Sequence, residues 1–351
     1  MKYDGSLSYK GTVTPLQKVM LWRRSFRKYR DGVVTAEQAA EIDAAARAFS
    51  GRMGFDSPAI RTTVAPAEFK AVVGAALKGV VGKINPWLPF TKAGAMILAI
   101  GNPLKAPVFG DRRVGVAQIA MVMEAAVLHA ASMGLGTCWM AGINSREIEK
   151  TLGLPDEREI IAISTLGHPP AGISLLSWDG MTHHLVSKKR KPLSELVFVD
   201  RLGVRIPDSG FSQIGSIEGD ALGAIFNAAR VAPSADNVQM WRFVIAHAPE
   251  TKMALLAALP GGCRASFQQA PLLIAALAEP WFVKGSRREQ PFFMIDVPIA
   301  ISHIVLQAAE LGIACAVEFG VDEAAVKAAV GAGEGFRAVA LVALGNQRRN
   351  T

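Results

Sequence analysis

The chain has 351 residues, of which 50% are hydrophobic and 19% are charged, and its mean hydropathy is +0.26. This composition predicts one large or two ordinary globular domains with a substantial core, and it excludes an intrinsically disordered chain. The net charge of +8 would suit phosphate-bearing ligands, nucleic acid or an anionic membrane, but the basic residues are scattered without interleaved aromatics, so we expect no nucleic-acid partner.

The beginning of the chain and its apolar runs favour a cytoplasmic protein with no membrane partner. Met1–Lys10 is polar and lacks the apolar core of a signal peptide. No apolar stretch approaches the roughly 20 residues that span a bilayer, and the longest, such as Ala270–Ala278, suit buried strands. Cys138, Cys263 and Cys315 cannot all pair and lack metal-ligand spacing, so we expect reduced thiols.

Helical signals recur along the chain. Thr35 begins a capping box with Gln38 before an apolar-periodic run, and Asn144 opens a short helix that ends before Gly153. Two long Ala-rich amphipathic stretches, Gly115–Ser132 and Pro298–Glu310, predict longer helices.

Compact apolar runs predict strands between these helices. They lie at Ala95–Ile100, Glu159–Thr165, Trp241–Ala246, Pro271–Leu277 and Arg337–Leu344. Helices and strands mix without a regular βαβ rhythm, so the fold class is α+β rather than doubly wound.

The sequence contains an internal repeat. Gly134 and Gly312 each follow a long helical stretch, and with the same offset of 178 residues Gly142, Gly153 and Leu166-Gly167 fall without a gap on Gly320, Gly331 and Leu344-Gly345. At the front, with an offset of 183, Ala45-Ala46-Arg47 falls on Ala228-Ala229-Arg230. Chance similarity of Ala-rich helices would not place the glycines in register. We therefore expect two related halves, at 1–200 and 201–351, joined by the polar stretch from about Ser187 to Gly215.

Four segments in order resemble motifs of the nitroreductase superfamily. They are Arg23-Arg24-Ser25-Phe26-Arg27 (Arg-x-Ser-x-Arg/Lys), Gly134-Leu-Gly-Thr-Cys-Trp139-Met140-Ala141-Gly142, the basic tail Lys188-Lys-Arg190-Lys-Pro192-Leu, and Pro233-Ser234-Ala235-Asp236-Asn237-Val-Gln-Met240-Trp241 (Pro-Ser-x-x-Asn-x-Gln-Pro-Trp). Met240 stands where the family usually has Pro, and Ala141 where it usually has Gly. The resemblance covers nearly the whole chain and implies an α+β, nitroreductase-like fold whose two fused halves form an internal pseudo-dimer.

In that superfamily, two identical subunits build two flavin sites, and each site takes the Pro-Ser-x-x-Asn segment from the other subunit. Here each half keeps only the motif that the other half lacks. Arg23–Arg27 falls on Ile206–Gly210, which has no basic residue, and Pro233, Ser234 and Asn237 fall on Ser50, Gly51 and Gly54. The resemblance therefore implies one composite FMN site and one dead site.

The resemblance also implies which residues bind FMN: Arg23, Arg24, Ser25, Arg27, Trp139, Met140, Ala141, Gly142, Lys188, Arg190, Pro233, Ser234, Ala235 and Asn237. By the same resemblance, Arg23 and Ser25 contact the ribityl-phosphate arm, and Lys188 and Arg190 reach the phosphate. Arg27 lies at the pyrimidine edge, where negative charge develops on reduction. The Gly142 amide lies near N5 or O4.

Each segment also has a plainer interpretation. In this interpretation the basic runs Arg23–Arg30 and Ser187–Lys191 would be solvated surface, Pro233–Asn237 would be a helix-ending loop and Trp139 would be a core aromatic. For Cys138 we expect packing rather than redox chemistry. His183 and His184 have no Cys, Asp or Glu partner at ligand spacing, so we expect neither a metal site nor a catalytic triad.

The resemblance implies an FMN-dependent oxidoreductase. NADH or NADPH would pass a hydride to flavin N5 and leave, and a nitroaromatic, quinone-like or unknown small acceptor would then be reduced in ping-pong fashion without an obligatory protein acid or base. The alternatives are an FMN-dependent dehydrogenase or oxidase of an amino-acid- or peptide-derived substrate, a flavin storage or sensing protein, and a scaffold with a decayed site. Trp87–Phe90 and Trp281–Phe293 either roof the pocket or belong to the core. We expect a monomer or a weak homo-oligomer.

Overall fold

The structure is a computed structural model, and it describes residues 13–55, 59–79, 87–88, 91–102, 107–110, 112–171, 189–206, 210–214, 217–279 and 292–346. The chain forms two compact units. The first unit consists of Val19–Pro107 and Gly115–Lys189, and the second unit consists of Met1–Lys18, Val108–Val114 and Arg190–Thr351. This division differs from the predicted boundary between residues 200 and 201, because Met1–Lys18, Val108–Val114 and residues 190–200 belong to the second unit.

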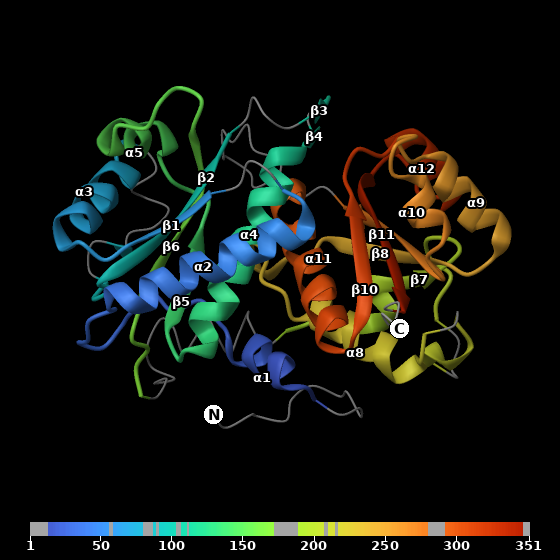
Figure 1. Ribbon diagram of the computed structural model, residues 1–351, viewed down its shortest axis with the longest axis horizontal. Helices are drawn as coiled ribbons and strands as arrows, with labels where there is room; N and C mark the ends of the chain where they lie inside the picture. Colours follow the sequence, from blue (N-terminus) through green and yellow to red (C-terminus); the bar gives the residue numbers. More distant parts are fainter. Residues whose placement is uncertain are drawn as a thin grey trace. The chain divides into compact units, whose positions relative to one another are not determined.

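The first unit is a four-stranded antiparallel sheet with helices on both faces (Figure 1). Its strand order is β1-β2-β6-β5. The elements are α2 (Ala36–Met53), β1 (Ala59–Thr63), α3 (Pro66–Ala76), β2 (Ala95–Gly101), α4 (Val114–Ser132, whose first residue belongs to the second unit), β5 (Gly136–Met140), α5 (Ser145–Leu152) and β6 (Glu159–Gly167). Helix α1 (Pro15–Trp22) begins in the second unit and ends in the first.

The second unit has a five-stranded sheet of order β10-β11-β9-β8-β7, in which β7 pairs with β8 in parallel. The elements are β3 (Val108–Phe109), β4 (Arg112–Arg113), α7 (Leu193–Leu196), β7 (Val197–Val199), α8 (Gly219–Arg230), β8 (Trp241–Ala246), α9 (Pro249–Ala257), α10 (Arg264–Gln268), β9 (Leu272–Ala278), α11 (Phe293–Glu310), β10 (Ile313–Glu318), α12 (Glu323–Ala329) and β11 (Arg337–Asn346). Two short 3-10 helices cover Gly210–Gln213 and Ala235–Asn237.

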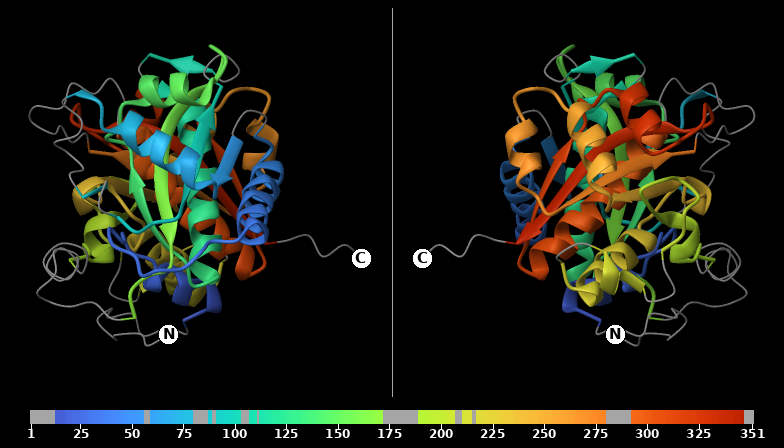
Figure 2. Two further views of the ribbon diagram at one scale, coloured as in Figure 1. Left: turned by 90° about the vertical axis from the view of Figure 1, so that its left-hand side faces the viewer. Right: turned by 90° about the vertical axis from the view of Figure 1, so that its right-hand side faces the viewer.

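The two units share one topology, because β1-β2-β6-β5 and β8-β9-β11-β10 have the same order and the same antiparallel pairing. Helices α3 and α5 lie over the sheet of the first unit as α9 and α12 lie over that of the second (Figure 2). The repeat inferred from the sequence is therefore confirmed at the level of the fold. The fold class is α+β, as predicted.

Strand register confirms the repeat residue by residue. Gly136 pairs with Gly167 in the first unit, and 178 residues later Ala314 pairs with Gly345. A β-bulge interrupts β6 opposite the step from Ala99 to Ile100, and the matching irregularity in β11 falls between Ala338 and Ala340. A slip of one residue would turn every side chain to the wrong face of the sheet. The equal register therefore turns equivalent positions of the two units toward the same face of each sheet.

The glycines that repeat between the two halves adopt the same backbone conformation at equivalent positions. Gly134 and Gly312 have φ of 77° and 72°, and Gly153 and Gly331 have φ of 61° and 64°. Each pair follows a helix at the same place in its unit, where the chain turns through the left-handed region that favours glycine. The predicted caps are also present, since Thr35 forms a capping box with Gln38 and Asn144 caps α5.

Helices α4 and α11 correct the expectation that no apolar stretch approaches membrane-spanning length. They have 19 and 18 residues and pass a test of length and composition for membrane spans. However, 83% of the apolar window of each helix is buried, as in core helices of globular proteins. Helix α11 also begins at Phe293, before the predicted start at Pro298, which stands inside it. A proline there removes one helical hydrogen bond but leaves the core-facing residues in place.

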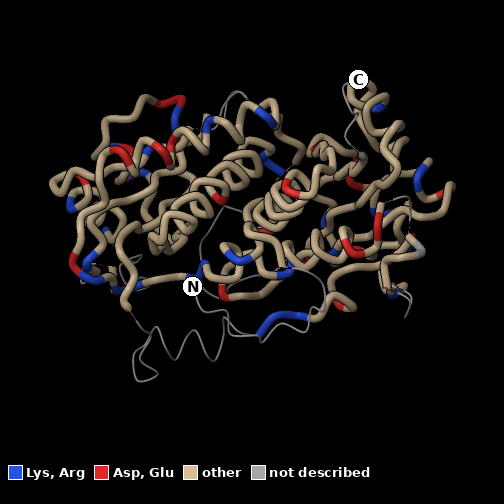
Figure 3. Tube along the Cα trace, turned by 60° about the horizontal axis from the view of Figure 1, so that its bottom comes forward, with Lys and Arg blue, Asp and Glu red and all other residues tan. Residues whose placement is uncertain are grey.

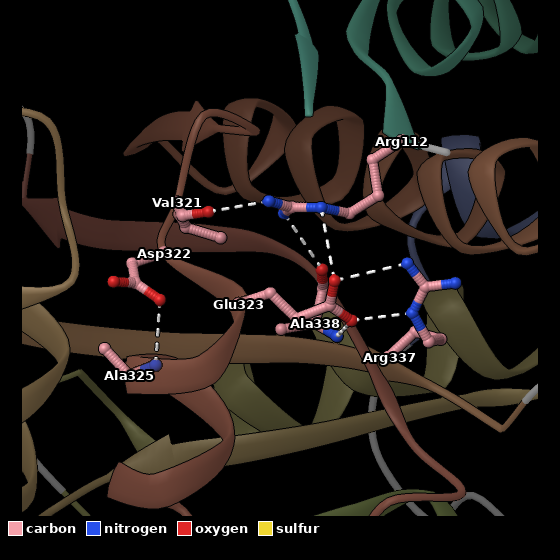
Figure 4. A network of polar contacts seen from close by, with 7 residues as sticks. All are labelled: Arg112, Val321, Asp322, Glu323, Ala325, Arg337 and Ala338. Atoms are coloured by element: carbon pink, nitrogen blue, oxygen red, sulfur yellow. Dashed lines mark hydrogen bonds and ion pairs between the residues drawn. The ribbon is translucent and has the colours of Figure 1, made fainter. Parts of the chain in front are cut away.

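The β3–β4 hairpin is fixed to the second unit by a buried arginine (Figure 4). Arg112 donates from Nη1 to the carbonyl oxygen of Ala338 at 3.2 Å and from Nη2 to that of Val321 at 2.9 Å. Its Nε lies 3.4 Å from Glu323, which also pairs with Arg337. These contacts explain why residues 108–114 belong to the second unit.

Candidate functional site

In the first unit the segment that contains Arg23 and Arg27 runs along the outer edge of β5. Ser25 forms a parallel bridge with Thr137, and the Phe26 N–H donates to the Thr137 carbonyl oxygen at 2.8 Å. Phe26 is buried, whereas Arg24, Ser25 and Arg27 are half-buried. The fold thus brings the first and second predicted motifs together, although more than 100 residues separate them in the sequence.

Glycines allow this close approach. A Cβ atom on Gly136 would lie 2.9 Å from Cδ2 of Phe26, and one on Gly167 would lie 3.0 Å from Cδ1 of Tyr29. The Tyr29 hydroxyl donates to the Phe26 carbonyl oxygen at 2.8 Å and lies 2.6 Å from Oγ1 of Thr165. Because a tyrosine hydroxyl has one proton, Thr165 donates to Tyr29. These contacts hold the arginine segment in one position on the sheet.

A buried carboxylate joins the two motifs of the first unit. Glu124 in α4 is 0% exposed, and its Oε2 accepts from Nε1 of Trp139 at 2.7 Å. Its Oε1 lies 3.9 Å from Nε of Arg23, which is itself 7% exposed. Burial lowers the pKa of Arg23, and the Glu124 carboxylate raises it. Sequence reasoning missed Glu124, although a lone acid within an apolar helix is a signal of a buried polar contact.

The remaining residues predicted in the first unit divide between faces of β5. Met140 is buried in the core cluster beneath α3 and α5, so its side chain serves packing. Trp139, the preceding residue, is half-buried and faces Glu124. Cζ of Arg27 lies 5.9 Å from the ring centroid of Trp87, and Cζ of Arg24 lies 4.5 Å from that of Phe26. Ala141 and Gly142 follow β5 directly.

In the second unit the Pro233–Gln239 segment is a strained loop. Asp236, Asn237 and Gln239 have φ of 46°, 57° and 52°, which is uncommon for residues other than glycine. Such conformations cost free energy, and they persist only where surrounding contacts hold them; they cluster at functional sites. Sequence reasoning expected turn chemistry here but not this degree of strain.

Side chains hold the loop. Arg190 donates from Nη1 to Oδ1 of Asn237 and to the carbonyl oxygen of Ala232, both at 2.8 Å. The Gln239 N–H donates to Oγ of Ser234 at 3.0 Å, and Oε1 of Gln239 accepts from the Lys191 N–H at 2.8 Å. The structure therefore brings Arg190, Ser234 and Asn237 together in one loop region. Lys188, His183 and His184 lie outside the described residues.

A second residue that sequence reasoning missed is Asp296, in the first turn of α11. Its Oδ2 accepts from the Ala235 N–H at 3.0 Å, and its side chain is buried. The pKa of Asp296 is raised to about 8: burial raises it, the hydrogen bond from the Ala235 N–H opposes the rise, and the charge of nearby Asp236 adds to it. The raised pKa favours the protonated carboxyl of Asp296 in the folded chain.

The described part of the chain contains no group of three or more His, Cys, Asp or Glu side chains that could hold a metal ion. Lys and Arg lie scattered along the trace, interspersed with Asp and Glu (Figure 3). The two clusters above, in the first and the second unit, are therefore the candidate functional residues.

Two family models match the chain. The model described as "Nitroreductase family" matches residues 20–168, and the model described as "Putative TM nitroreductase" matches residues 108–308, more than half of the chain. No curated protein sequence matches it.

Several solved structures are also similar to parts of the chain. A nitroreductase family protein from Clostridium novyi NT has 18% identity and a TM-score of 0.38, and the overlap covers 55% of this chain and 97% of that one. A nitroreductase family protein from Clostridium difficile 630 has 23% identity and a TM-score of 0.38, and the match covers 50% of this chain and 94% of that one. An FMN-dependent nitroreductase from Clostridium difficile R20291 has 19% identity and a TM-score of 0.35, and the match covers 46% of this chain and 92% of that one.

The two family models establish the family of this chain. One of these models covers more than half of the chain, and the repeated sheet topology accounts for two domains. The chain therefore belongs to the nitroreductase family, as a nitroreductase-type oxidoreductase that carries two nitroreductase-type domains in tandem.

Proposed function

We propose that the chain binds one FMN and uses NADH or NADPH to reduce a nitroaromatic, quinone-like or other small acceptor. One observation carries this proposal: each half retains one set of the residues that the family motifs assign to flavin and has lost the other set. Arg23 and Arg27 have Ile206 and Gly210 at the equivalent positions of the second half, and Asn237 has Gly54 in the first. A repeat that decayed at random would not lose complementary motifs.

The residues of the first unit fit a phosphate-bearing ligand. Nε of Arg23 is buried and donates no hydrogen bond to any residue of the described chain. A buried donor without a partner costs free energy, so an anion that accepts from the guanidinium would stabilise this arrangement. Arg24, Ser25 and Arg27 add donors on the same segment.

The residues of the second unit fit the acceptor-rich edge of a flavin. The Arg190 guanidinium can only donate, so the Asn237 atom that it contacts is Oδ1. Oγ of Ser234 accepts from Gln239, which leaves its proton to donate. The loop can thus present side-chain donors to carbonyl oxygens and ring nitrogens.

FMN, when bound, supplies two-electron chemistry by taking a hydride from the nicotinamide and giving it to the acceptor. The chain's own residues bind and orient this group. We assign Arg23, Ser25, Lys188 and Arg190 to the phosphate-bearing arm. Arg27 would supply a fixed positive charge for the pyrimidine edge of the flavin, which would favour reduction of the bound cofactor.

The test is the visible absorption spectrum of the purified protein, with flavin quantitation after denaturation. We expect about one FMN per chain and bleaching by NADH or NADPH under anaerobic conditions. Two FMN per chain would contradict the complementary assignment, and no FMN, even after addition, would overturn the proposal. Bound FMN that neither nicotinamide reduces would favour the oxidase or the flavin storage alternative.

A further inference from the structure

We propose that Glu124 is a positioning residue of the cofactor site, one that holds Arg23 and Trp139 in place for the phosphate-bearing arm of the ligand. This inference rests on the proposed function. Glu124 lies outside the four motif segments.

The position of Glu124 is unusual for a carboxylate. It is the only acidic residue of α4, whose other residues are mostly Ala, Val, Met, Ile and Leu, and it is 0% exposed. An isolated buried carboxylate is strongly disfavoured unless hydrogen bonds and an opposite charge compensate it. Trp139 supplies a hydrogen bond at 2.7 Å, and Arg23 supplies the charge at 3.9 Å.

The fold itself does not require this cluster. The second unit has the same sheet order and register, and there Ser302 stands at the position of Glu124, Val317 at that of Trp139 and Ile206 at that of Arg23. Ser302 is buried in α11 and bonds only locally to the carbonyl oxygen of Ile299 among the contacts described for it. All three members of the cluster are absent together from a half that folds in the same way.

The geometry shows what the carboxylate can do for Arg23. At 3.9 Å the charges attract, but Nε does not donate to Glu124 at hydrogen-bond distance. The negative charge of Glu124 therefore stabilises the buried, positively charged guanidinium of Arg23. It does so without accepting a hydrogen bond from Nε of Arg23. An anionic ligand can then accept from Arg23, while the indole of Trp139 stays fixed by its own bond to the carboxylate.

The experiment compares FMN with riboflavin, which has the same ring system but no phosphate, by titration of wild type, Glu124→Gln and Ser302→Ala. The amide side chain that Glu124→Gln introduces would keep an acceptor for Trp139 but no charge for Arg23. We expect Glu124→Gln to weaken FMN binding by roughly tenfold or more, as losses of supporting residues do in metal sites, and to change riboflavin affinity much less. Ser302→Ala, at the equivalent position, should change neither.

The outcomes are distinct. If wild type does not bind FMN, the proposed function fails, and this inference fails with it. If wild type binds FMN and Glu124→Gln binds it equally well or more tightly, or loses FMN and riboflavin equally, the inference alone is overturned. Should Glu124→Gln not fold, Glu124→Asp takes its place. Aspartate keeps the charge, but its shorter side chain moves the carboxylate away from Arg23 and Trp139, so we expect a smaller loss of preference for FMN over riboflavin, and an unchanged preference would overturn the inference. Near-ultraviolet circular dichroism without ligand reports whether Trp139 has moved, and because glutamine keeps the acceptor for its indole, we expect no change in Glu124→Gln or in Ser302→Ala.

Discussion

The side chain of Asp296 links the Pro233–Gln239 loop to pH. Burial raises its pKa from 3.8 to about 8 in the folded chain. Between these values the folded chain keeps a proton that the unfolded chain has released, so unfolding releases a proton. The contribution of Asp296 to the free energy of unfolding is therefore largest below about pH 4, falls by up to about 1.4 kcal/mol per pH unit toward pH 8, and is constant above.

The substitution Asp296→Asn tests this linkage, because asparagine can still accept from the Ala235 N–H but does not ionise. We expect wild type to lose stability relative to Asp296→Asn as the pH rises from 5 to 8, because ionisation of the buried carboxyl is unfavourable only in the folded chain. Urea unfolding of both proteins at several pH values in this window measures the difference. A difference that does not vary with pH would show that Asp296 is ionised in the folded chain.

Because Gly136 has no side chain, Phe26 can pack directly against the backbone of β5. In Gly136→Ala, the new Cβ would lie 2.9 Å from Cδ2 of Phe26 and 3.2 Å from Cε1 of Tyr29. We expect a loss of about 1–3 kcal/mol in the free energy of unfolding, as for overpacked cores, together with weaker FMN binding because the arginine segment is displaced from β5.

The matched control is Gly51→Ala in α2, where a Cβ would meet no atom within 4 Å. Alanine is the better helix former by about 0.5–1 kcal/mol, so this variant should be as stable as wild type or more stable. Thermal unfolding and FMN titration of the two variants make the comparison. Equal behaviour of both would contradict the close approach at β5.

At the scale of elements, the β3–β4 hairpin depends on Arg112. The exposed side chains of Val108 and Phe109 contribute little burial, whereas Arg112 is 4% exposed and bonds to the carbonyl oxygens of Ala338 and Val321. In Arg112→Ala the carbonyl oxygens of Ala338 and Val321 lose a buried donor, which costs about 1–3 kcal/mol, while Glu323 keeps its pair with Arg337. We expect hydrogen exchange of residues 107–114 to rise sharply.

Val108→Ser is the control for the hairpin, because this side chain is 56% exposed. It should leave both hydrogen exchange and the urea midpoint near the wild-type values. Exchange in Arg112→Ala that stays as slow as in wild type would mean that β3 and β4 are held by other contacts.

At the scale of the whole molecule, the tandem arrangement has a consequence for stoichiometry. If Arg27 and Asn237 serve one FMN, then Arg27→Ala and Asn237→Ala each weaken all FMN binding, and the double variant has no site left to fill. We expect loss of roughly tenfold or more in affinity for each single variant, since each removes a direct charged or polar contact. In a chain with two independent sites, each single variant would keep about half of the bound FMN at wild-type affinity, and isothermal titration calorimetry distinguishes the two cases.

The sequence predicted much of the fold, because local patterns encode it. Strand Trp241–Ala246 has the predicted bounds, and β2, β6, β9 and β11 differ from prediction by only one or two residues at either end. The capping box at Thr35 and the glycines Gly134 and Gly312 depend on the nearest neighbours in the chain, which a single sequence shows directly. The strands β1, β3, β4, β5, β7 and β10 were not predicted, and β5 lies within a segment that was interpreted as a flavin-binding motif.

The sequence by itself therefore determined the repeat, the fold class, the family motifs and most of the elements, all of which depend on periodicity or on matching segments along the chain. Only the tertiary structure placed Glu124 against Trp139 and Arg23, Asp296 against Ala235, and residues 108–114 in the second unit. The physical reason is that these contacts join residues far apart in the sequence. Whether a buried charge is tolerated depends on the partner that the fold brings to it, and no local pattern records that partner.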